Sequence, residues 1–329
     1  MTVRGEVLVV TRKFDPTADI VIKKLAGLGE RVNRINSDEF PVEAEFTGIM
    51  NDEEVDFEFR TGTRLIHSTE IKSAWFRQPF DFKLSDEIKG SSIIRFTEVE
   101  SLHSVIGFLS SLECFWLNRP DLAIHGSYKL VQLRAASRVG LAIPNTLVTN
   151  SPNKAREFVG EKPEDFVTKC ITSAMIKSEN RPRAIFTRKI DPDLLGQIEQ
   201  VRYCPTLFQN YIKKRAEVRV IVVCDRIFSF LILNQEAPSE LTKVDWRHYD
   251  LENVRHEEFR LPMEVERKIL EFTKSLNLNF GAVDMILTPE DEFVFLELNP
   301  TGQWGWLEEL TGVRVSDYIV EILANPPNI

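Results

Sequence analysis

The stretch that decides the fold is Phe280-Gly281-Ala282-Val283-Asp284-Met285-Ile286-Leu287, followed after a short break by Phe293-Val294-Phe295-Leu296-Glu297-Leu298-Asn299-Pro300. Both segments are strongly apolar, and the intervening Pro289-Glu290-Asp291-Glu292 is typical of a turn, so the pair predicts a β-hairpin. If Glu290 and Asp291 form a two-residue tip, Asp284 lies directly opposite Glu297. Asn299, two residues farther on, then shares their face of the hairpin.

Two carboxylates at facing positions of an apolar hairpin need a counter-charge. At a separation of about 5 Å they repel each other, and burying them without compensation costs several kcal/mol. A divalent cation removes both problems, because the oxygens of Asp, Glu and Asn are the hard ligands that Mg²⁺ takes. The alternative is a solvent-facing strand edge whose charges are incidental. The uniformly apolar neighbours favour a metal site at Asp284, Glu297 and Asn299.

Composition restricts the class of protein. The chain has 329 residues, of which 43% are hydrophobic and 28% are charged, as in ordinary globular proteins, and its length predicts two or three domains. A formal net charge of −9 argues against a general nucleic-acid-binding protein, which needs a basic surface. The cysteines are widely separated, and the sequence has neither a membrane-spanning apolar run nor a signal-peptide pattern. We therefore expect a cytoplasmic protein that binds no membrane.

The N-terminal part of the chain has an α/β pattern. A β-α-β unit is expected over residues 6–35, because two apolar strands flank a segment with helical spacing. This unit lacks the GxGxxG signature of dinucleotide sites. Antiparallel strands are expected within 46–59 and an amphipathic helix at 96–112. Residues 116–125 are expected to form a loop that crosses to the next domain.

The remainder of the chain changes from mixed to strand-rich patterns. A strand is expected at 166–171 and a helix at 192–202, with Asp191 as the N-cap of that helix. From Thr206 onward, apolar strand patterns dominate. The predicted domains are 1–117, 118–205 and 206–329, which are an α/β domain, a small central domain and a domain with an antiparallel sheet.

Charged and polar residues precede the hairpin in a recognisable order. Lys129 opens a helix, and Lys169 stands among apolar strand neighbours, where an ammonium group is costly unless it meets an anion or its stem reaches outward. Taken singly, each lysine is more often a solvated surface residue. The series continues with Gln209-Asn210-Tyr211-Ile212, then Glu217-Val218-Arg219, and ends in Glu297-Leu298-Asn299-Pro300-Thr301-Gly302. In this order the chain resembles the ATP-grasp superfamily of carboxylate ligases.

Segments outside the ATP-grasp core give a narrower resemblance. They are residues 74–79 (AWFRQP), Asn118-Arg119-Pro120, residues 129–133 (KLVQL), residues 143–150 (IPNTLVTN) and Asp245-Trp246-Arg247. In these segments the chain resembles the microviridin-type graspetide macrocyclases, which cross-link side chains of a ribosomally made precursor peptide. That family usually has two arginines in the first segment, and Gln78 replaces the second of them here.

The resemblance implies a fold, cofactors and site residues. The implied fold is ATP-grasp, of class α/β (α+β), with an N-terminal α/β pre-ATP-grasp domain, a small central lid and a C-terminal antiparallel sheet. The implied cofactors are ATP and two Mg²⁺. The implied residues are Lys129, Lys169, Gln209, Asn210, Tyr211, Ile212 and Glu217 for ATP, Asp284, Glu297 and Asn299 for the metal, and Arg219, Arg247 and Asp245 for catalysis.

The catalytic residues also have structural interpretations. Arg219 would steady the transferring phosphoryl group, or else pair with Glu217 or another neighbouring acid. Arg247 would hold the acidic side chain that is activated. Asp245 would orient Arg247 or accept a proton from the attacking nucleophile. Alternatively, Asp245 and Arg247 are loop surface charges with Trp246 packed beneath them.

For the reaction, the resemblance implies that ATP converts an Asp or Glu side chain of the peptide to an acyl phosphate. A Thr or Ser hydroxyl or a Lys amine of the same peptide then forms a macrocyclic ester or amide. A leader segment of the peptide would dock on the basic stretch from Lys177 to Arg202, the core would lie near Arg247, and the enzyme would form a homodimer. Thr172-Ser173-Ala174 departs from the glycine-rich phosphate loop of many ATP-grasp lids.

Three other functions compete with this one. An ordinary ATP-grasp peptide or amino-acid ligase, of the glutamate-ligase type, would act on a C-terminus or a small metabolite. A non-catalytic, ATP-regulated peptide-binding protein would tolerate loss of a metal ligand, yet all three candidate ligands are present. An ATP-grasp kinase would release a stable phosphorylated product. The sequence does not distinguish ester from amide formation, nor does it specify the precursor.

Overall fold

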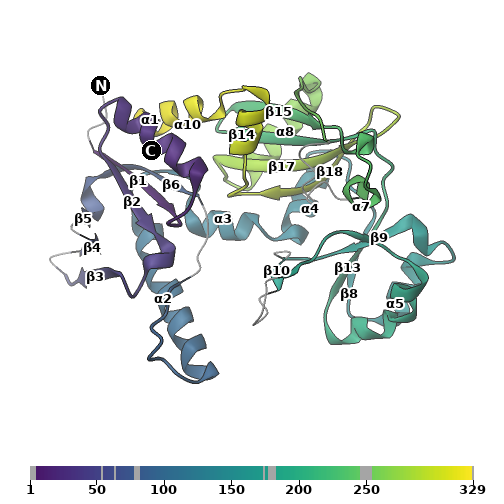
Figure 1. The fold of residues 1–329 in the computed structure, drawn as a ribbon, viewed down its shortest axis with the longest axis horizontal. Coiled ribbons are helices and arrows are strands. Elements are labelled where there is room, and N and C mark those ends of the chain that lie inside the picture. Colours follow the sequence, from purple (N-terminus) through teal and green to yellow (C-terminus); the bar gives the residue numbers. More distant parts are fainter. Residues whose placement is uncertain are drawn as a thin grey trace.

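The computed structural model describes residues 5–52, 55–62, 64–77, 82–172, 175–176, 183–244 and 254–327. These residues form five sheets. In Figure 1 the sheets of the N-terminal region (purple to blue), the central region (teal) and the C-terminal region (green to yellow) lie in different parts of the molecule. The mixed α/β class expected from the sequence is confirmed. No helix among the described residues is long and apolar enough to span a membrane.

The N-terminal region contains a parallel sheet with strand order β2-β1-β6-β7 and a smaller antiparallel sheet of order β3-β4-β5. Its elements are β1 (Glu6–Thr11), α1 (Pro16–Gly27), β2 (Val32–Asn36), β3 (Ala44–Met50), β4 (Val55–Thr61), β5 (Arg64–His67), β6 (Ile71–Phe76), α2 (Ser91–Ser111), β7 (Phe115–Leu117) and α3 (Pro120–Gly126). Leu8 and Val10 of β1 face a core that α2 and the small sheet complete. Val7 and Val9 face the opposite core with α1. The parallel sheet is therefore buried on both faces, as such sheets require.

The central region is a small antiparallel sheet of order β12-β9-β13-β8 with short helices, and a separate pair of strands β10-β11. Its elements are α4 (Lys129–Arg138), β8 (Thr146–Thr149), α5 (Pro152–Val159), β9 (Phe166–Lys169), β10 (Met175–Ile176), β11 (Arg183–Ala184), β12 (Arg188–Lys189), α6 (Pro192–Gly196), the 3₁₀ helix η4 (Ile198–Tyr203) and β13 (Thr206–Asn210). A core of its own, which includes Val159, Ile198 and Phe208, holds this sheet to α5.

The C-terminal region is a five-stranded antiparallel sheet of order β16-β15-β14-β17-β18. Its elements are β14 (Ala216–Val223), β15 (Arg226–Ile232), α7 (Glu240–Val244), β16 (His256–Glu258), α8 (Met263–Ser275), β17 (Phe280–Leu287), β18 (Phe293–Asn299), α9 (Gly305–Thr311) and α10 (Val315–Ala324). Val218, Val220 and Val222 of β14 pack against α8 and α4. On the other face, Ile221 and Val223 join the core of the N-terminal region.

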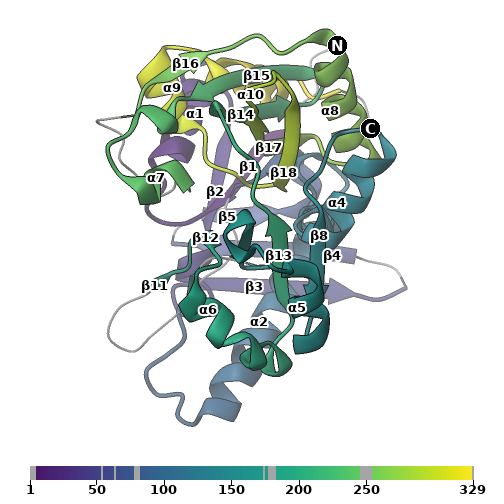
Figure 2. The same ribbon diagram turned by 90° about the vertical axis from the view of Figure 1, so that its right-hand side faces the viewer.

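The last helix, α10, returns to the first region of the chain. It packs beside α1 (Figure 1), and Lys24 Nζ lies 2.5 Å from Asp317 Oδ1. Ser73 Oγ donates a hydrogen bond of 2.6 Å to the Leu323 carbonyl. The N-terminal and C-terminal regions therefore share one continuous core, whereas the central sheet has a core of its own and lies below the C-terminal sheet in Figure 1 and Figure 2.

Two expectations about individual elements were wrong. Residues 116–125 are not a loop, because Trp116 and Leu117 extend β7, which pairs with β6, and Pro120 begins α3 at a position where its missing N–H costs nothing. The helix expected at 192–202 divides, since α6 ends at Gly196 and a 3₁₀ helix follows. Asp191 is the N-cap as predicted, and its Oδ1 accepts a hydrogen bond of 2.8 Å from Leu194 N.

Candidate functional site

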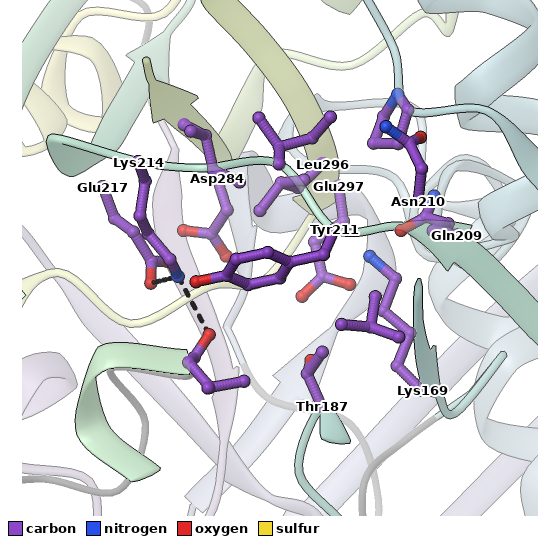
Figure 3. A pocket seen from close by; sticks show the side chains of 15 residues that line it. Lys169, Thr187, Gln209, Asn210, Tyr211, Lys214, Glu217, Asp284, Leu296 and Glu297 are labelled. Carbon is purple, nitrogen blue, oxygen red and sulfur yellow. Dashed lines mark hydrogen bonds and ion pairs between the residues drawn. The ribbon is translucent and has the colours of Figure 1, made fainter. Parts of the chain in front are cut away.

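A pocket lies between the central sheet and the C-terminal sheet. Strands β9 and β13 supply one wall, and β14, β17 and β18 supply the other. Figure 3 shows Lys169 and Gln209 entering from the first wall and Glu217, Asp284 and Glu297 from the second. A pocket at the interface between two sheets is where proteins usually place a small ligand.

The hairpin that opened the sequence analysis forms one side of this pocket. Asp284 of β17 pairs directly with Glu297 of β18, which confirms the predicted register at this point. The predicted two-residue tip is wrong, because Thr288 and Glu292 close a three-residue tip and Asp291 adopts a left-handed conformation with φ of 64°. A bulge between Asp284 and Met285 restores the pairing. As a result, Leu296 and Glu297 both line the pocket.

Each of the facing carboxylates has a cationic partner. Arg219 donates from one terminal nitrogen to Asp284 Oδ1 at 2.7 Å, and Lys129 Nζ donates to Glu297 Oε2. Asp284 is 9% exposed, so this pairing compensates a charge that is nearly buried. Two carboxylates at one site, with cations beside them, form a hard-oxygen donor set that fits a divalent metal and the phosphates it accompanies.

Asn299 is on the same strand but at the margin of this group. It pairs with Ala282 in the sheet, is exposed, and does not line the pocket. Its Oδ1 accepts a hydrogen bond of 3.0 Å from Thr301 N. The carbonyl oxygen that would serve as a metal ligand is therefore held toward the backbone of the following turn.

The segment Gln209-Asn210-Tyr211-Ile212 crosses between the two sheets and lines the pocket with all four residues. Gln209 is buried, and its Nε2 donates 2.8 Å to Thr146 Oγ1. Tyr211 N donates 2.6 Å to the Asp165 carbonyl, and Lys189 Nζ lies 3.9 Å from the centroid of the Tyr211 ring. This connection therefore has a fixed backbone and an aromatic side chain facing the cavity.

A buried ion pair between Lys214 and Glu217 also lines the pocket, and sequence reasoning missed the lysine. Lys214 Nζ donates 2.6 Å to Glu217 Oε1 and 2.9 Å to the Val244 carbonyl, as the dashed lines in Figure 3 show. Asn234 Nδ2 donates 2.9 Å to the same Glu217 oxygen. In sequence, Lys214 stands in the basic run Lys213-Lys214-Arg215, which looks like a solvated turn.

Comparisons with known proteins identify the fold around this pocket. The family model of the MvdD pre-ATP grasp domain matches residues 6–122. The chain is 33% identical to the macrocyclase MdnB from Microcystis aeruginosa MRC, covering 97% of this chain and 99% of that one, with a TM-score of 0.80. The chain belongs to the ATP-grasp ligase family that includes this macrocyclase. The expected ATP-grasp fold is confirmed, and ligases of this family use ATP with Mg²⁺.

Two further relatives are similar over different extents. A RiPP-associated ATP-grasp ligase of Chryseobacterium gregarium, solved in complex with ADP and a leader and core peptide, is 29% identical, with 98% of each chain covered and a TM-score of 0.88. The tetrahydromethanopterin:alpha-L-glutamate ligase of Methanocaldococcus jannaschii is 24% identical over 209 residues, which are 62% of this chain and 68% of that protein.

The other residues predicted for the site of this ATP-grasp ligase fall into two groups. Arg219 pairs with Asp284, a neighbouring acid. Asp245 and Arg247 lie outside the described residues, as do Gln78, Ser173, Ala174 and the first part of the stretch that begins at Lys177.

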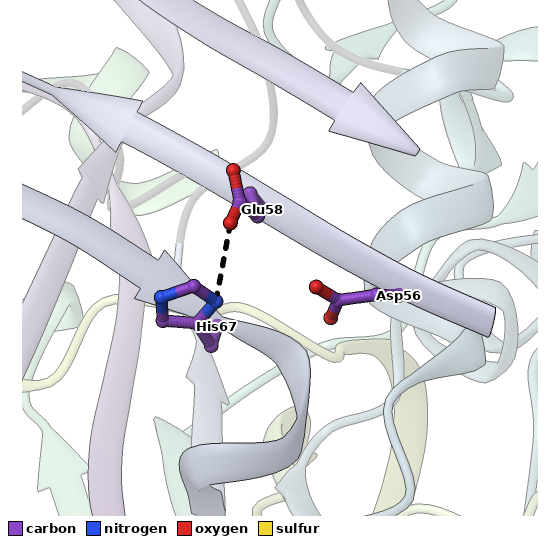
Figure 4. Close-up of side chains that lie close together, drawn as sticks. All are labelled: Asp56, Glu58 and His67. Carbon is purple, nitrogen blue, oxygen red and sulfur yellow. Dashed lines mark ion pairs between the residues drawn. The ribbon is translucent and has the colours of Figure 1, made fainter. Parts of the chain in front are cut away.

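A separate group of acidic and imidazole side chains lies in the N-terminal region (Figure 4). Asp56 and Glu58 are on β4, and His67 of β5 is directly opposite Glu58. His67 Nδ1 lies 3.4 Å from Glu58 Oε1. All three are half-buried side chains of a polar sheet face, so the group is explained by cross-strand ion pairing.

Proposed function

We propose that this ligase joins side chains within a ribosomally made precursor peptide. It activates an Asp or Glu side chain as an acyl phosphate and couples it to a Thr or Ser hydroxyl or a Lys amine, forming a macrocyclic ester or amide. The observation that carries this proposal is the pocket in which Asp284 and Glu297 face each other beside Arg219 and Lys129. The similarity to MdnB over nearly the whole chain supports the macrocyclase assignment.

Each pocket residue has a proposed role in binding Mg-ATP. Lys129 and Lys169 would contact the phosphates as point charges. The backbone from Gln209 to Ile212 would meet the adenine edge, and Glu217 would bind the nucleotide close to its pair with Lys214. Asp284, Glu297 and Asn299 would hold two Mg²⁺, which supply charge neutralisation at the phosphates when bound.

The chemistry follows from the poor leaving ability of hydroxide. The γ-phosphoryl group passes from ATP to a carboxylate oxygen of the peptide, giving ADP and an acyl phosphate. The hydroxyl or amine then attacks the carbonyl carbon, loses its proton and expels phosphate. Arg219, which is 5% exposed, would stabilise negative charge on the transferring group from a fixed position. Arg247 would bind the acceptor carboxylate, and Asp245 would orient Arg247.

The peptide is proposed to bind in two places. The leader would dock between Lys177 and Arg202, and the core near Arg247. Among the described residues of the leader stretch, Arg188 pairs with Asp191 and Arg202 with Glu199. These exposed pairs are weak, so an acidic peptide exchanges with them at little cost. We also propose that the three domains are 1–117, 118–205 and 206–329, that the enzyme is cytoplasmic and, on the family resemblance, that it is a homodimer.

A second candidate is a ligase of the glutamate-ligase type, and the similarity to the Methanocaldococcus enzyme favours it. Such an enzyme adds an amino acid to a C-terminus or a small metabolite. It would therefore increase the mass of its acceptor, whereas internal cross-linking of a peptide removes one water for each bond.

Mass spectrometry of a cognate precursor peptide incubated with the enzyme and Mg-ATP tests the proposal. We expect loss of one water per bond, with one ADP formed for each. Glu297→Gln should lower this rate by about 10²-fold or more, because a charged group at the phosphoryl-transfer site is lost. The control is Glu290→Gln at the exposed tip of the same hairpin, which should react normally. Normal product formation by Glu297→Gln would overturn the assignment of the site.

A further inference from the structure

The segment from Glu297 to Gln303 carries two proposed metal ligands and leaves the C-terminal sheet at its edge. Strand β18 is the last strand of that sheet, so only one side of it pairs with another strand of the sheet. An unsupported edge segment frays, which would leave Glu297 and Asn299 poorly placed. Three buried polar side chains from outside the C-terminal sheet bind this segment instead, and they belong to Gln132, Asn118 and Arg77.

Gln132 of α4 takes the place of a neighbouring strand. Its Oε1 accepts a hydrogen bond of 2.9 Å from Leu298 N, and its Nε2 donates 2.7 Å to the Leu298 carbonyl. The same Nε2 donates a hydrogen bond of 2.7 Å to the Gly126 carbonyl, so the amide group makes three hydrogen bonds in all. Gln132 is 1% exposed, and Leu298 lies between Glu297 and Asn299. The amide therefore fixes the backbone at the midpoint of the two proposed ligands.

Asn118, which follows β7, holds the next turn. Its Nδ2 donates 2.8 Å to the Pro300 carbonyl and 2.8 Å to the Phe280 carbonyl. Its Oδ1 accepts from Asn279 N at 2.7 Å and from Phe280 N at 2.8 Å. One buried amide thus ties the start of β17 to the residue just beyond β18, and so fixes the two strands that carry Asp284 and Glu297.

Arg77, which follows β6, holds the end of the segment. One terminal nitrogen donates 2.8 Å to the Thr301 carbonyl and the other donates to Gln303 Oε1. Asp15 Oδ2 lies 3.7 Å from Arg77 Nε. Burial lowers the pKa of Arg77 to about 10, so the guanidinium is still protonated at neutral pH. Arg219 also binds this loop, because one of its terminal nitrogens donates a hydrogen bond of 3.0 Å to the Gln303 carbonyl.

We propose that Gln132, Asn118 and Arg77 are positioning residues that fix the backbone from which Glu297 and Asn299 would reach Mg²⁺. This inference rests on the proposed metal role of those two residues. Each contact joins the metal segment to a part of the chain before residue 140, so side chains outside the C-terminal sheet contribute to metal binding without contacting the metal. Residues that orient metal ligands in this way typically contribute 10- to 100-fold to metal affinity.

Titration calorimetry of ADP binding, with and without Mg²⁺, tests this role independently of peptide chemistry. For Arg77→Lys, which keeps the charge but loses the paired donors, and for Gln132→Glu, which keeps the size but loses the amide donors, we expect two results. The Mg²⁺ concentration for half-maximal ADP binding rises about tenfold. The affinity for ADP in EDTA stays within about twofold of the wild type, because the nucleotide wall of the pocket is untouched.

Lys72→Met is the matched control. Lys72 is a buried cation in β6, near Arg77, and its Nζ donates 2.8 Å to the Ala324 carbonyl and pairs with Glu30 at 2.7 Å. It joins the same two regions without contacting the segment from Glu297 to Gln303, so its loss should lower the melting temperature and leave the Mg²⁺ response unchanged. A Mg²⁺ response equal to wild type in Arg77→Lys and Gln132→Glu overturns the inference, as does an equal shift in Lys72→Met.

The failure of the proposed function would look different. If wild-type enzyme binds Mg-ADP and the two variants show the expected shift, but no peptide is cross-linked, the positioning role stands and the macrocyclase proposal falls.

Discussion

Lys214 and Glu217 illustrate how a buried pair of charges is balanced by its surroundings. Both side chains are under one-tenth exposed, the Val244 carbonyl accepts a second hydrogen bond from Lys214, and Asn234 donates one to Glu217. Removing one partner of such a pair leaves an uncompensated buried charge, which usually costs about 3–5 kcal/mol. Removing both partners costs less, because no isolated charge then remains.

A double-mutant cycle measures this balance. We expect Lys214→Met to lower the free energy of unfolding by about 3 kcal/mol, and Lys214→Met/Glu217→Gln to recover more than half of that loss. Urea unfolding of the two single variants, the double variant and the wild type provides the measurement. Strictly additive losses would show that the two charges are uncoupled.

The residues found and missed in the sequence differ in how they are recognised. Asp284 and Glu297 were evident because acids interrupt apolar strands, a local signal. Lys214, Gln132 and Arg77 were not proposed as site or positioning residues, because each acts through partners far away in sequence, such as Val244, Leu298 and Thr301. A single sequence holds no record of such pairings, and a buried lysine looks like an exposed one until its fold is known.

At the scale of the element, the hairpin β17–β18 shows which features a sequence pattern predicts. A two-residue tip at Glu290 and Asp291 predicted the pairing of Asp284 with Glu297, which the structure confirms. The turn was wrong by one residue, and a bulge at the other end of the paired stretch compensated for it. The type of turn depends on small differences in backbone energy, such as the cost of a left-handed Asp291. Which side chains of a buried strand point into the core is determined instead by the packing of the whole core.

The loop that follows β18 has no room for a larger residue at Gly302. A Cβ there would lie 2.3 Å from the Ala282 Cβ and 2.9 Å from a terminal nitrogen of Arg219. We expect Gly302→Ala to lower the free energy of unfolding by about 1–3 kcal/mol, since the backbone must move. Because Arg219 would move with it, ATP turnover should also fall.

The matched control is Gly107→Ala within α2, where a Cβ meets nothing within 4 Å. This change should raise stability by about 0.5–1 kcal/mol, because alanine favours the helix. Chemical denaturation and ATP turnover of the two variants make the comparison. If Gly302→Ala behaves like Gly107→Ala, the loop is not tightly packed.

For the whole molecule, the class of fold and the order of its regions could be predicted, since they depend on long apolar patterns and on an ordered set of motifs. The joining of the regions could not. The parallel sheet and the C-terminal sheet share one core because Val9 and Ile221, far apart in sequence, pack into the same cluster. The expected loop at 116–125 failed for the same reason, as β7 exists only beside β6.

Thiol reactivity reports whether these cores are closed. Burial raises the pKa of Cys114 to about 12 and that of Cys224 to about 11, whereas Cys204 is exposed. The thiolate is the reactive form, and a raised pKa lowers its fraction at pH 8. In a Cys170→Ser background, we expect Ellman's reagent to modify one thiol rapidly and two slowly. Cys204→Ser should remove the fast phase, and rapid modification of Cys114 would contradict the packing of the N-terminal region.

The packing of α10 against α1 has a consequence for the synthesis of the chain on the ribosome. Val7 and Val9 are covered only in part, by α1, until Ile319 and Leu323 have been made. At about 5–20 residues per second, a ribosome takes at least about 15 s to reach them. Throughout that time the nascent N-terminal sheet presents an apolar surface to which chaperones and other emerging chains have access. The first sheet to be translated is therefore the last to be sealed, and early termination of synthesis would leave it open.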